Sequence, residues 1–214
     1  MTERPPLHTA VDIPQIIVVT GVMAAGKSTV SQLLAERFSR AVHLRGDEFR
    51  RVVVRGRADM SPYGDPEAER QLALRHMIAA HSANLYADAG FTVVVQDLFV
   101  GATLQPFLDQ LLARPLSLVM LAPDVGTVMR REAERVKVGY GDLWSIRDFD
   151  HKVRTETPHI GLWLDSSQQT PDETVEEIVT RLTEARIADG PPGIPPDRLR
   201  SGGHERVSTR REPG

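Results

Sequence analysis

The sequence predicts a three-layer α/β protein in which a five-stranded parallel sheet carries helices on both faces. Five short apolar segments alternate along the chain with segments whose apolar residues recur at helical spacing. A glycine-rich loop joins the first of these predicted strands to the first helix. Polar residues follow four of the five strands directly, as expected where ligands lie beyond the carboxyl ends of parallel strands.

Length and composition fit one domain of this class. The chain has 214 residues, of which 41% are hydrophobic and 26% charged. We place a single folded domain at residues 14–189. Residues 1–13 are expected to be flexible, and residues 190–214, rich in Gly, Pro, Arg and Ser, are expected to form a disordered tail.

Charge and cysteine content disfavour several function classes. The chain has no cysteine, which removes disulfides, thiolate catalysis and Cys-ligated zinc. Its net charge of -3 argues against a dedicated nucleic-acid surface. No apolar run approaches the roughly 18 residues of a membrane span, and the first 13 residues lack the apolar core of a signal peptide. These features predict a cytoplasmic protein without a membrane partner and leave its oligomeric state open.

The first half of the chain alternates strands and helices. Short, mainly apolar runs predict strands at 15–20, 41–44 and 91–95. Helical spacing predicts helices at 27–38, near Asp47 and at 67–89, and Gly and Pro residues predict a loop at 55–66. The apolar, buried face of the long helix is expected to consist of Leu74, Met77, Ile78, His81 and Leu85.

The second half continues the alternation. Helices are expected at 103–113, from Asp124 to about 135, and at 146–156, and strands at 116–121 and 161–164. Thr170-Pro171-Asp172-Glu173 combines an N-cap residue, proline at the first helical position and glutamate at the third. This capping box predicts the start of the last helix.

The loop after the first strand carries the most specific motif of the chain. Gly21-Val22-Met23-Ala24-Ala25-Gly26-Lys27-Ser28 fits the phosphate-binding pattern G-x-x-x-x-G-K-[ST]. In that pattern backbone N–H groups and a helix N-terminus surround phosphates, Lys27 reaches the β/γ-phosphates and Ser28 ligates Mg²⁺. The motif therefore predicts binding of ATP and Mg²⁺ by residues 21–28 and Thr29.

Two carboxylates follow strands at the same predicted edge. Asp47 follows the second strand, where it can accept a proton from an attacking hydroxyl. The alternative role is that of a helix N-cap. Asp97 ends the third strand, where it can hold Mg²⁺ together with Ser28. The alternative is that Asp97 only bonds to the following turn.

Arginines after the fourth strand are candidates for a lid over the phosphates. The group contains Arg130, Arg131, Arg135 and Lys137. Arginine forks stabilise the charge that phosphoryl transfer spreads over oxygen atoms, and we expect Arg131 or Arg135 in this role. The alternative is a solvated helix face with local ion pairs.

Three further features are left with open roles. Arg50, Arg51, Arg55 and Arg57 either bind an anionic acceptor or form a solvated surface. Residues 166–169 either border an adenine ring or form a plain loop. Of the two histidines of the long helix, His81 is expected to be packed rather than catalytic.

These motifs together resemble a known family. The phosphate loop, Asp47, Gln96-Asp97-Leu98-Phe99-Val100-Gly101 and Arg131-x3-Arg135-Val136-x2-Gly139 resemble chloramphenicol phosphotransferase and its relatives, within the small P-loop kinases that include shikimate kinase, gluconate kinase and zeta toxins. The resemblance covers residues 15–185. It implies a sheet of the nucleoside-monophosphate-kinase type with a lid, with Asp47 as base and Arg131 or Arg135 as the lid arginine. The family often has paired acids where this chain has Gln96-Asp97.

Three functions are compatible with these features. The first is a kinase that transfers the γ-phosphate of ATP to a hydroxyl of an antibiotic-, sugar- or nucleoside-like molecule. The second is a kinase for a nucleotide-sugar or a nucleic-acid 5′ end, which the arginines at 50–57 favour and the acidic pI of about 6.2 disfavours. The third is a nucleotide-binding ATPase or switch without an acceptor.

Overall fold

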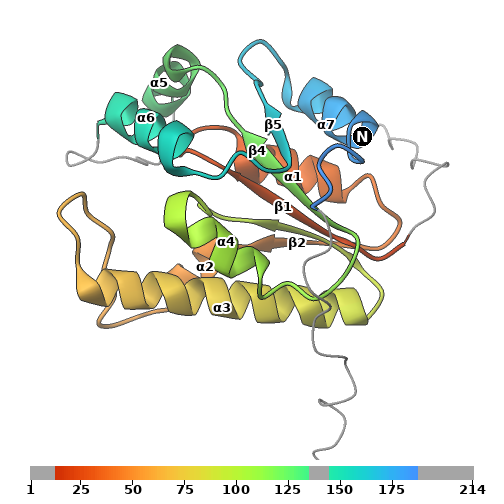
Figure 1. Cartoon of the computed structure of the whole chain (residues 1–214), viewed down its shortest axis with the longest axis horizontal. Coiled ribbons are helices and arrows are strands. Elements are labelled where there is room, and N and C mark those ends of the chain that lie inside the picture. The colour runs from red at the N-terminus through yellow and green to blue at the C-terminus, as the bar shows by residue number, and fades with distance from the viewer. Residues whose placement is uncertain (1–12, 135–144, 188–214) are drawn as a thin grey trace, which may run out of the picture.

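The computed structural model describes residues 13–134 and 145–187 and contains one five-stranded parallel sheet. The strands are β1 (Ile16–Gly21), β2 (Ala41–Arg45), β3 (Thr92–Gln96), β4 (Leu116–Leu121) and β5 (Leu162–Leu164). Their order across the sheet is β2-β3-β1-β4-β5 (Figure 1). All pairs are parallel, with Val19 opposite both Gln96 and Val119, so the strands end along one edge. The predicted fold class is confirmed.

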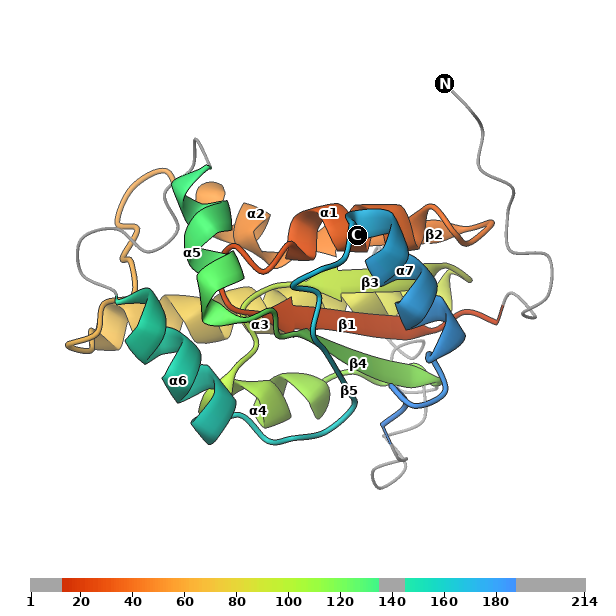
Figure 2. The same cartoon turned by 90° about the horizontal axis from the view of Figure 1, so that it is seen from above.

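Helices cover both faces of this sheet. They are α1 (Lys27–Ala35), α2 (Gly46–Arg51), α3 (Pro66–Asp88), α4 (Leu104–Leu108), α5 (Val125–Ala133), α6 (Ile146–Glu156) and α7 (Pro171–Thr180), with a short 3₁₀ turn at Gly101–Thr103. Helices α1 and α7 lie on one face, and α3 and α4 lie on the other (Figure 2). Helices α2 and α5 stand near the carboxyl edge of the sheet, where β1 ends (Figure 2).

The side-chain alternation of the strands divides the core in two. Ile17, Val19 and Val94 pack with α1 and α7, whereas their neighbours Val18 and Val93 pack with α3 and α4. All five are fully buried. The central strands are thus apolar on both sides, which is typical of a parallel sheet covered by helices.

Helix ends follow the local sequence. The Asp65 side chain accepts hydrogen bonds from the N–H groups of Glu67 and Ala68 and caps α3, which begins at Pro66. The capping box of Thr170 and Glu173 starts α7 as predicted. Helices α1 and α4 are shorter than predicted. Shortly after Ala35 and after Leu108 the backbone hydrogen bonds join residues three apart, as in a 3₁₀ turn, instead of four apart.

The predicted buried face of α3 is wrong. The helix buries Ala79, Ala80 and Ala83 against the sheet, together with Ala68, His76 and Ala87, and exposes the larger Leu74, Met77, Ile78, His81 and Leu85. Small side chains let the helix approach the strands closely, and Phe99 and Phe107 fill the remaining space beside His76. His76, rather than His81, is the packed histidine, and burial lowers its pKa to about 4.

Some predictions concern residues outside the described ranges. Most of the predicted N-terminal segment and the whole predicted C-terminal tail lie there, as do Arg135, Lys137 and the expected loop at 136–144. Within residues 13–134 and 145–187, no helix is both long and apolar enough to cross a membrane.

Candidate nucleotide-binding and phosphotransfer site

The phosphate loop joins β1 to α1 through backbone conformations that favour glycine. Gly21 has φ 141° and Gly26 has φ 97°, and Ala24 is left-handed at φ 63°. A Cβ on Gly21 would lie 2.3 Å from the carbonyl oxygen of Leu121, so β4 also requires glycine here. The first motif glycine therefore fixes the loop against the sheet, and the second sets the turn into α1.

Lys27 is positioned by the loop itself. Its ammonium group donates hydrogen bonds to the carbonyl oxygens of Gly21 and Val22, both at 2.8 Å. Lys27 is also the first residue of α1, whose N-terminus carries a partial positive charge of about half a unit. The local field is thus positive where the motif predicts phosphates.

Ser28 meets Gln96 rather than Asp97. Its Oγ lies 3.4 Å from Gln96 Oε1 and 3.3 Å from Gln96 Nε2. In the sequence, Gln96 stands out only as a departure from the paired acids of the family that the chain resembles. The hydroxyl and amide oxygens form a donor set that suits Mg²⁺, with a carboxylate one residue further on.

Asp97 lies in a buried ion pair that the sequence did not predict. Arg75 of α3 places Nε 2.8 Å from Asp97 Oδ2 and donates from Nη2 to Oδ1 at 2.9 Å. The Leu98 N–H also donates to Oδ1 at 2.8 Å. Burial raises the pKa of Asp97, while Arg75, that N–H and Lys27 act in the opposite direction. Lys27 and Asp47 both act electrostatically on Asp97, so the three groups lie in one neighbourhood.

Asp47 lies inside the first turn of α2 and is not its N-cap. Arg45 occupies the cap position, and α2 begins at Gly46. A Cβ on Gly46 would lie 2.2 Å from Asp97 Oδ2, so the backbone before Asp47 rests directly on the Asp97 side chain. This close approach links the end of β2 to the end of β3.

Two arginines flank the Asp47 carboxylate. Arg45 Nε lies 3.6 Å from Oδ1, and Arg51 Nη2 lies 3.3 Å from Oδ2. The same arginines contact Glu48, at 3.6 Å and 2.9 Å. The Asp47 side chain is a quarter exposed. Arg45 is a site residue that was not predicted, although its place at the end of a strand is a usable signal.

Arg131 reaches the phosphate loop from α5. It donates from Nη1 to the Ala25 carbonyl at 3.3 Å and from Nη2 to the Ser166 carbonyl at 2.9 Å. Desolvation and the nearby Arg130 lower its pKa. Arg130 instead contacts Thr127 of its own helix at 3.3 Å. Of the predicted lid arginines, Arg131 is thus beside the loop, and Arg135 lies outside the described residues.

The segment after β5 holds α5 in place. Ser167 Oγ accepts a hydrogen bond from the Asp124 N–H at 2.7 Å, and Asp124 caps α5 by accepting from the Thr127 N–H. Hydrogen bonds to the Asp124 carboxylate, first that from the Thr127 N–H and then those from the Ser167 and Thr127 side chains, lower the pKa of Asp124 to about 2. The expectation that residues 166–169 border an adenine ring stays a prediction, and their described role is to position α5 and Arg131.

The arginines at 50–57 do not converge on one point. Arg50 and Arg57 both pair with Asp59 in the loop before α3, and Arg51 pairs with Asp47 and Glu48. Arg55 is exposed. Within residues 13–134 and 145–187, the contact of this group with a predicted catalytic residue is that of Arg51 with Asp47.

The fold and the loop define the class of protein. The strand order of the parallel sheet, with a glycine-rich loop and its lysine between β1 and α1, identifies a P-loop nucleotide-binding protein of kinase-like fold. Residues 16–143 match the AAA_33 family, described as AAA domain. This match spans more than half of the chain, and the protein belongs to that family.

Solved structures show the same fold. A sugar kinase from Janibacter sp. HTCC2649 has a TM-score of 0.59 and 16% identity, with 80% of this chain and 96% of that chain covered. Shikimate kinase from Acinetobacter baumannii, in complex with shikimate, has a TM-score of 0.53 and 20% identity, with 80% of this chain and 93% of that chain covered. The APS kinase of Mycobacterium tuberculosis, in complex with AMPPNP and APS, has a TM-score of 0.54 and 18% identity, with 84% of this chain and 99% of that chain covered. A search of curated proteins gave no match. The predicted resemblance to small P-loop kinases is confirmed.

Proposed function

We propose that the protein is an ATP-dependent phosphotransferase that moves the γ-phosphate to a hydroxyl of a small molecule. The observation that carries this proposal is the arrangement at one sheet edge of a phosphate loop, a carboxylate and an arginine. Asp47 follows β2, Lys27 follows β1, and Arg131 contacts the loop at Ala25. The APS kinase of the same fold was solved with an ATP analogue, which supports ATP as the donor.

Each residue has a distinct role in this reaction. Lys27 and the loop N–H groups bind the phosphates, and Arg131 stabilises charge on the transferring group. Asp47 accepts the proton of the acceptor hydroxyl as its oxygen bonds to the γ-phosphorus. The bond from that phosphorus to the bridging oxygen breaks, and the electron pair leaves with ADP.

Magnesium would be held by Ser28, with Asp97 or Gln96 as a further oxygen donor. Mg²⁺ held by these residues would supply positive charge that stabilises the phosphates. Asp97 can contribute only while it shares its carboxylate with Arg75, because both oxygens already meet that guanidinium. Within the described residues, the Gln96 side chain is hydrogen-bonded to Ser28 and not to an arginine, so it already lies beside the other proposed ligand.

An anionic acceptor is the second candidate. Arg45 and Arg51 lie on both sides of Asp47, at the place where an acceptor hydroxyl must be held. Guanidinium groups bind carboxylate and phosphate groups with matched geometry. A nucleotide-sugar or a nucleic-acid 5′ end would present such a group.

The acceptor is sought by mass spectrometry. The purified protein is incubated with ATP and Mg²⁺ and a panel of antibiotics, sugars, nucleosides, nucleotide-sugars and short oligonucleotides, and products heavier by one phosphoryl group are identified. Phosphorylation of a neutral hydroxyl compound supports the first candidate. Phosphorylation of anionic compounds alone supports the second. ATP loss that no panel member increases, without any phosphorylated product, would support an ATPase instead.

Replacement of Asp47 tests the mechanism on the acceptor so found. Asp47→Asn keeps the shape and removes the base, so turnover should fall about a hundredfold or more while calorimetric ATP binding changes little. Glu48→Gln is the matched control, because Glu48 contacts the same two arginines from the neighbouring position. Equal losses in both variants would show that local charge, rather than a base at Asp47, matters.

A further inference from the structure

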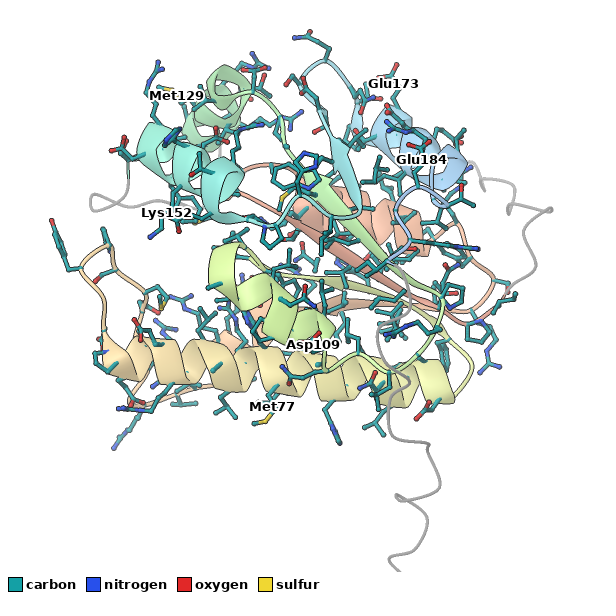
Figure 3. The ribbon with its side chains drawn as sticks, in the orientation of Figure 1. Met77, Asp109, Met129, Lys152, Glu173 and Glu184 are labelled. Atoms are coloured by element: carbon teal, nitrogen blue, oxygen red, sulfur yellow. The ribbon has the colours of Figure 1, made fainter. Side chains whose placement is uncertain are left out.

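Helix α3 turns a stripe of large apolar side chains away from the sheet. Leu74, Met77, Ile78 and Leu85 are 48%, 53%, 37% and 57% exposed, although the opposite face of the helix is buried. Spacings of three and four residues, completed by the exposed His81, place them along one side of the helix. In Figure 3 Met77 points outward from α3, and no described segment of the chain covers it.

The polar ends of this stripe carry opposite charges. Arg70 lies one turn before Leu74 and its side chain is 70% exposed, and the exposed Asp88 lies one turn after Leu85. Residues 70 and 88 are equidistant from residue 79, and so are 77 and 81. Residues 74 and 85 are equidistant from it to within one position. The pattern is therefore self-complementary under a two-fold rotation near residue 79.

We propose that a second copy of this chain covers the stripe, with the two α3 helices antiparallel about that two-fold axis. In this dimer Leu74 of one copy packs on Leu85 of the other, Met77 faces His81, and Arg70 pairs with Asp88 at both ends. A two-fold interface uses one patch on both subunits and requires this self-complementarity. The proposal goes beyond the phosphotransferase function and does not depend on it.

The chemistry of the stripe favours a protein copy over a membrane surface. Helices that lie on membranes carry Lys and Arg along the polar side. Here Glu67, Arg70 and Asp88 flank the stripe with both signs of charge. A uniformly cationic partner or an anionic lipid surface would meet like charge at one end.

The size of the stripe sets the expected affinity. From residue 70 to residue 88 the helix rises about 27 Å, and at a width of about 10 Å each copy offers a footprint on the order of 300 Å². Stable interfaces bury at least about 1,000 Å² in total. The total of about 600 Å² falls below this size, so we expect a weak, reversible dimer that forms between about 1 and 300 μM rather than a permanent one.

Sedimentation velocity of the full chain from about 1 to 300 μM tests the association. The sedimentation coefficient should rise from the monomer value toward the dimer value over this range. Leu85→Glu should keep the protein monomeric throughout. Met129→Glu is the control, because Met129 is an apolar residue, 41% exposed, on α5, far from Met77 in Figure 3. Circular dichroism at 1 μM checks that each variant is folded.

A charge exchange tests the predicted register. Arg70→Glu alone and Asp88→Arg alone should each weaken association about tenfold, and the double variant should regain the affinity of the original chain. Failure of this rescue would overturn the antiparallel register. A sedimentation coefficient that stays at the monomer value to 300 μM would overturn the dimer and leave the stripe to a different partner.

A cross-link tests the axis. The chain has no cysteine, so Ile78→Cys introduces the only thiol. The two introduced thiols lie near the axis on facing helices, and a short bismaleimide joins them without the strict geometry that a disulfide requires. Ile78→Cys should cross-link to a covalent dimer at 100 μM, whereas Met129→Cys should not. Equal yields from both positions would contradict an axis near residue 79.

Discussion

The Arg75–Asp97 ion pair is buried, with side chains that are 14% and 5% exposed, so we expect removal of Arg75 to destabilise the fold strongly. Arg75→Met keeps the aliphatic stem and removes the guanidinium, which leaves the Asp97 carboxylate buried with the Leu98 N–H at 2.8 Å and the field of Lys27. Removal of one partner of a buried ion pair costs about 3–5 kcal/mol. Because that N–H and Lys27 remain, we expect the lower end, about 3 kcal/mol.

Thermal unfolding followed by circular dichroism measures this effect. For a domain of this size, about 3 kcal/mol corresponds to a Tm lower by about 6–12 °C. Arg70→Met is the control, because the ion pair of Arg70 with Glu67 is exposed, and its Tm should change by no more than about 2 °C. Addition of Asp97→Asn to Arg75→Met should recover part of the loss, since the buried charge is then gone.

The pH dependence gives a second readout of the same variant. Burial raises the pKa of Asp97, and Arg75 acts against this rise. Without Arg75 the folded-state pKa lies higher still. A carboxyl with a raised folded pKa stabilises the fold below its unfolded pKa, and this stability is lost as the pH rises through the folded value. The Tm difference between Arg75→Met and the original chain should therefore shrink as the pH falls from 7.5 toward 5. A Tm loss below 2 °C at pH 7.5, or a difference that does not shrink, would show that Arg75 does not stabilise the buried charge of Asp97.

Two further substitutions probe the site. Gly46→Ala would place a Cβ 2.2 Å from Asp97 Oδ2 and should cost about 1–3 kcal/mol, measured by urea unfolding. Its cost combined with Asp97→Ala should be less than the sum of the two single costs, because that change removes the clashing oxygen, and simple additivity would contradict this contact. Arg131→Gln should lower turnover on the identified acceptor by about a hundredfold or more, because loss of one group that stabilises transition-state charge costs on that scale. Arg130→Gln, which alters a side chain bonded within its own helix, should change turnover less than threefold, and similar losses in both would leave Arg131 without a special role.

The sequence predicted those parts of the fold that depend on local patterns. All five strands agree with the structure to within about a residue at each end, because short apolar runs between Gly- and Pro-containing turns have few other stable arrangements. The phosphate loop was found because its function requires fixed residues at fixed spacings. The buried face of α3 was missed for a physical reason. The alanines and the larger apolar residues of α3 both recur at helical spacing, so the pattern alone does not tell which set is buried. The layer that α3 packs against, which contains Phe99 and Phe107, leaves room only for the small alanines.

The partners of Gln96 and Asp97 show the same limit within the site. Consecutive residues of an extended segment point to opposite faces of the sheet. Gln96 shares the face of Val94, which packs with α1, and so meets Ser28. Asp97 continues the face of Val93 and Val95, which packs with α3, and so meets Arg75. The alternation is readable from the sequence, but which helix covers which face is not. Asp97 therefore lies against Gly46, the residue before Asp47, and the neutral amide of Gln96 is the side chain that lies beside the phosphate loop.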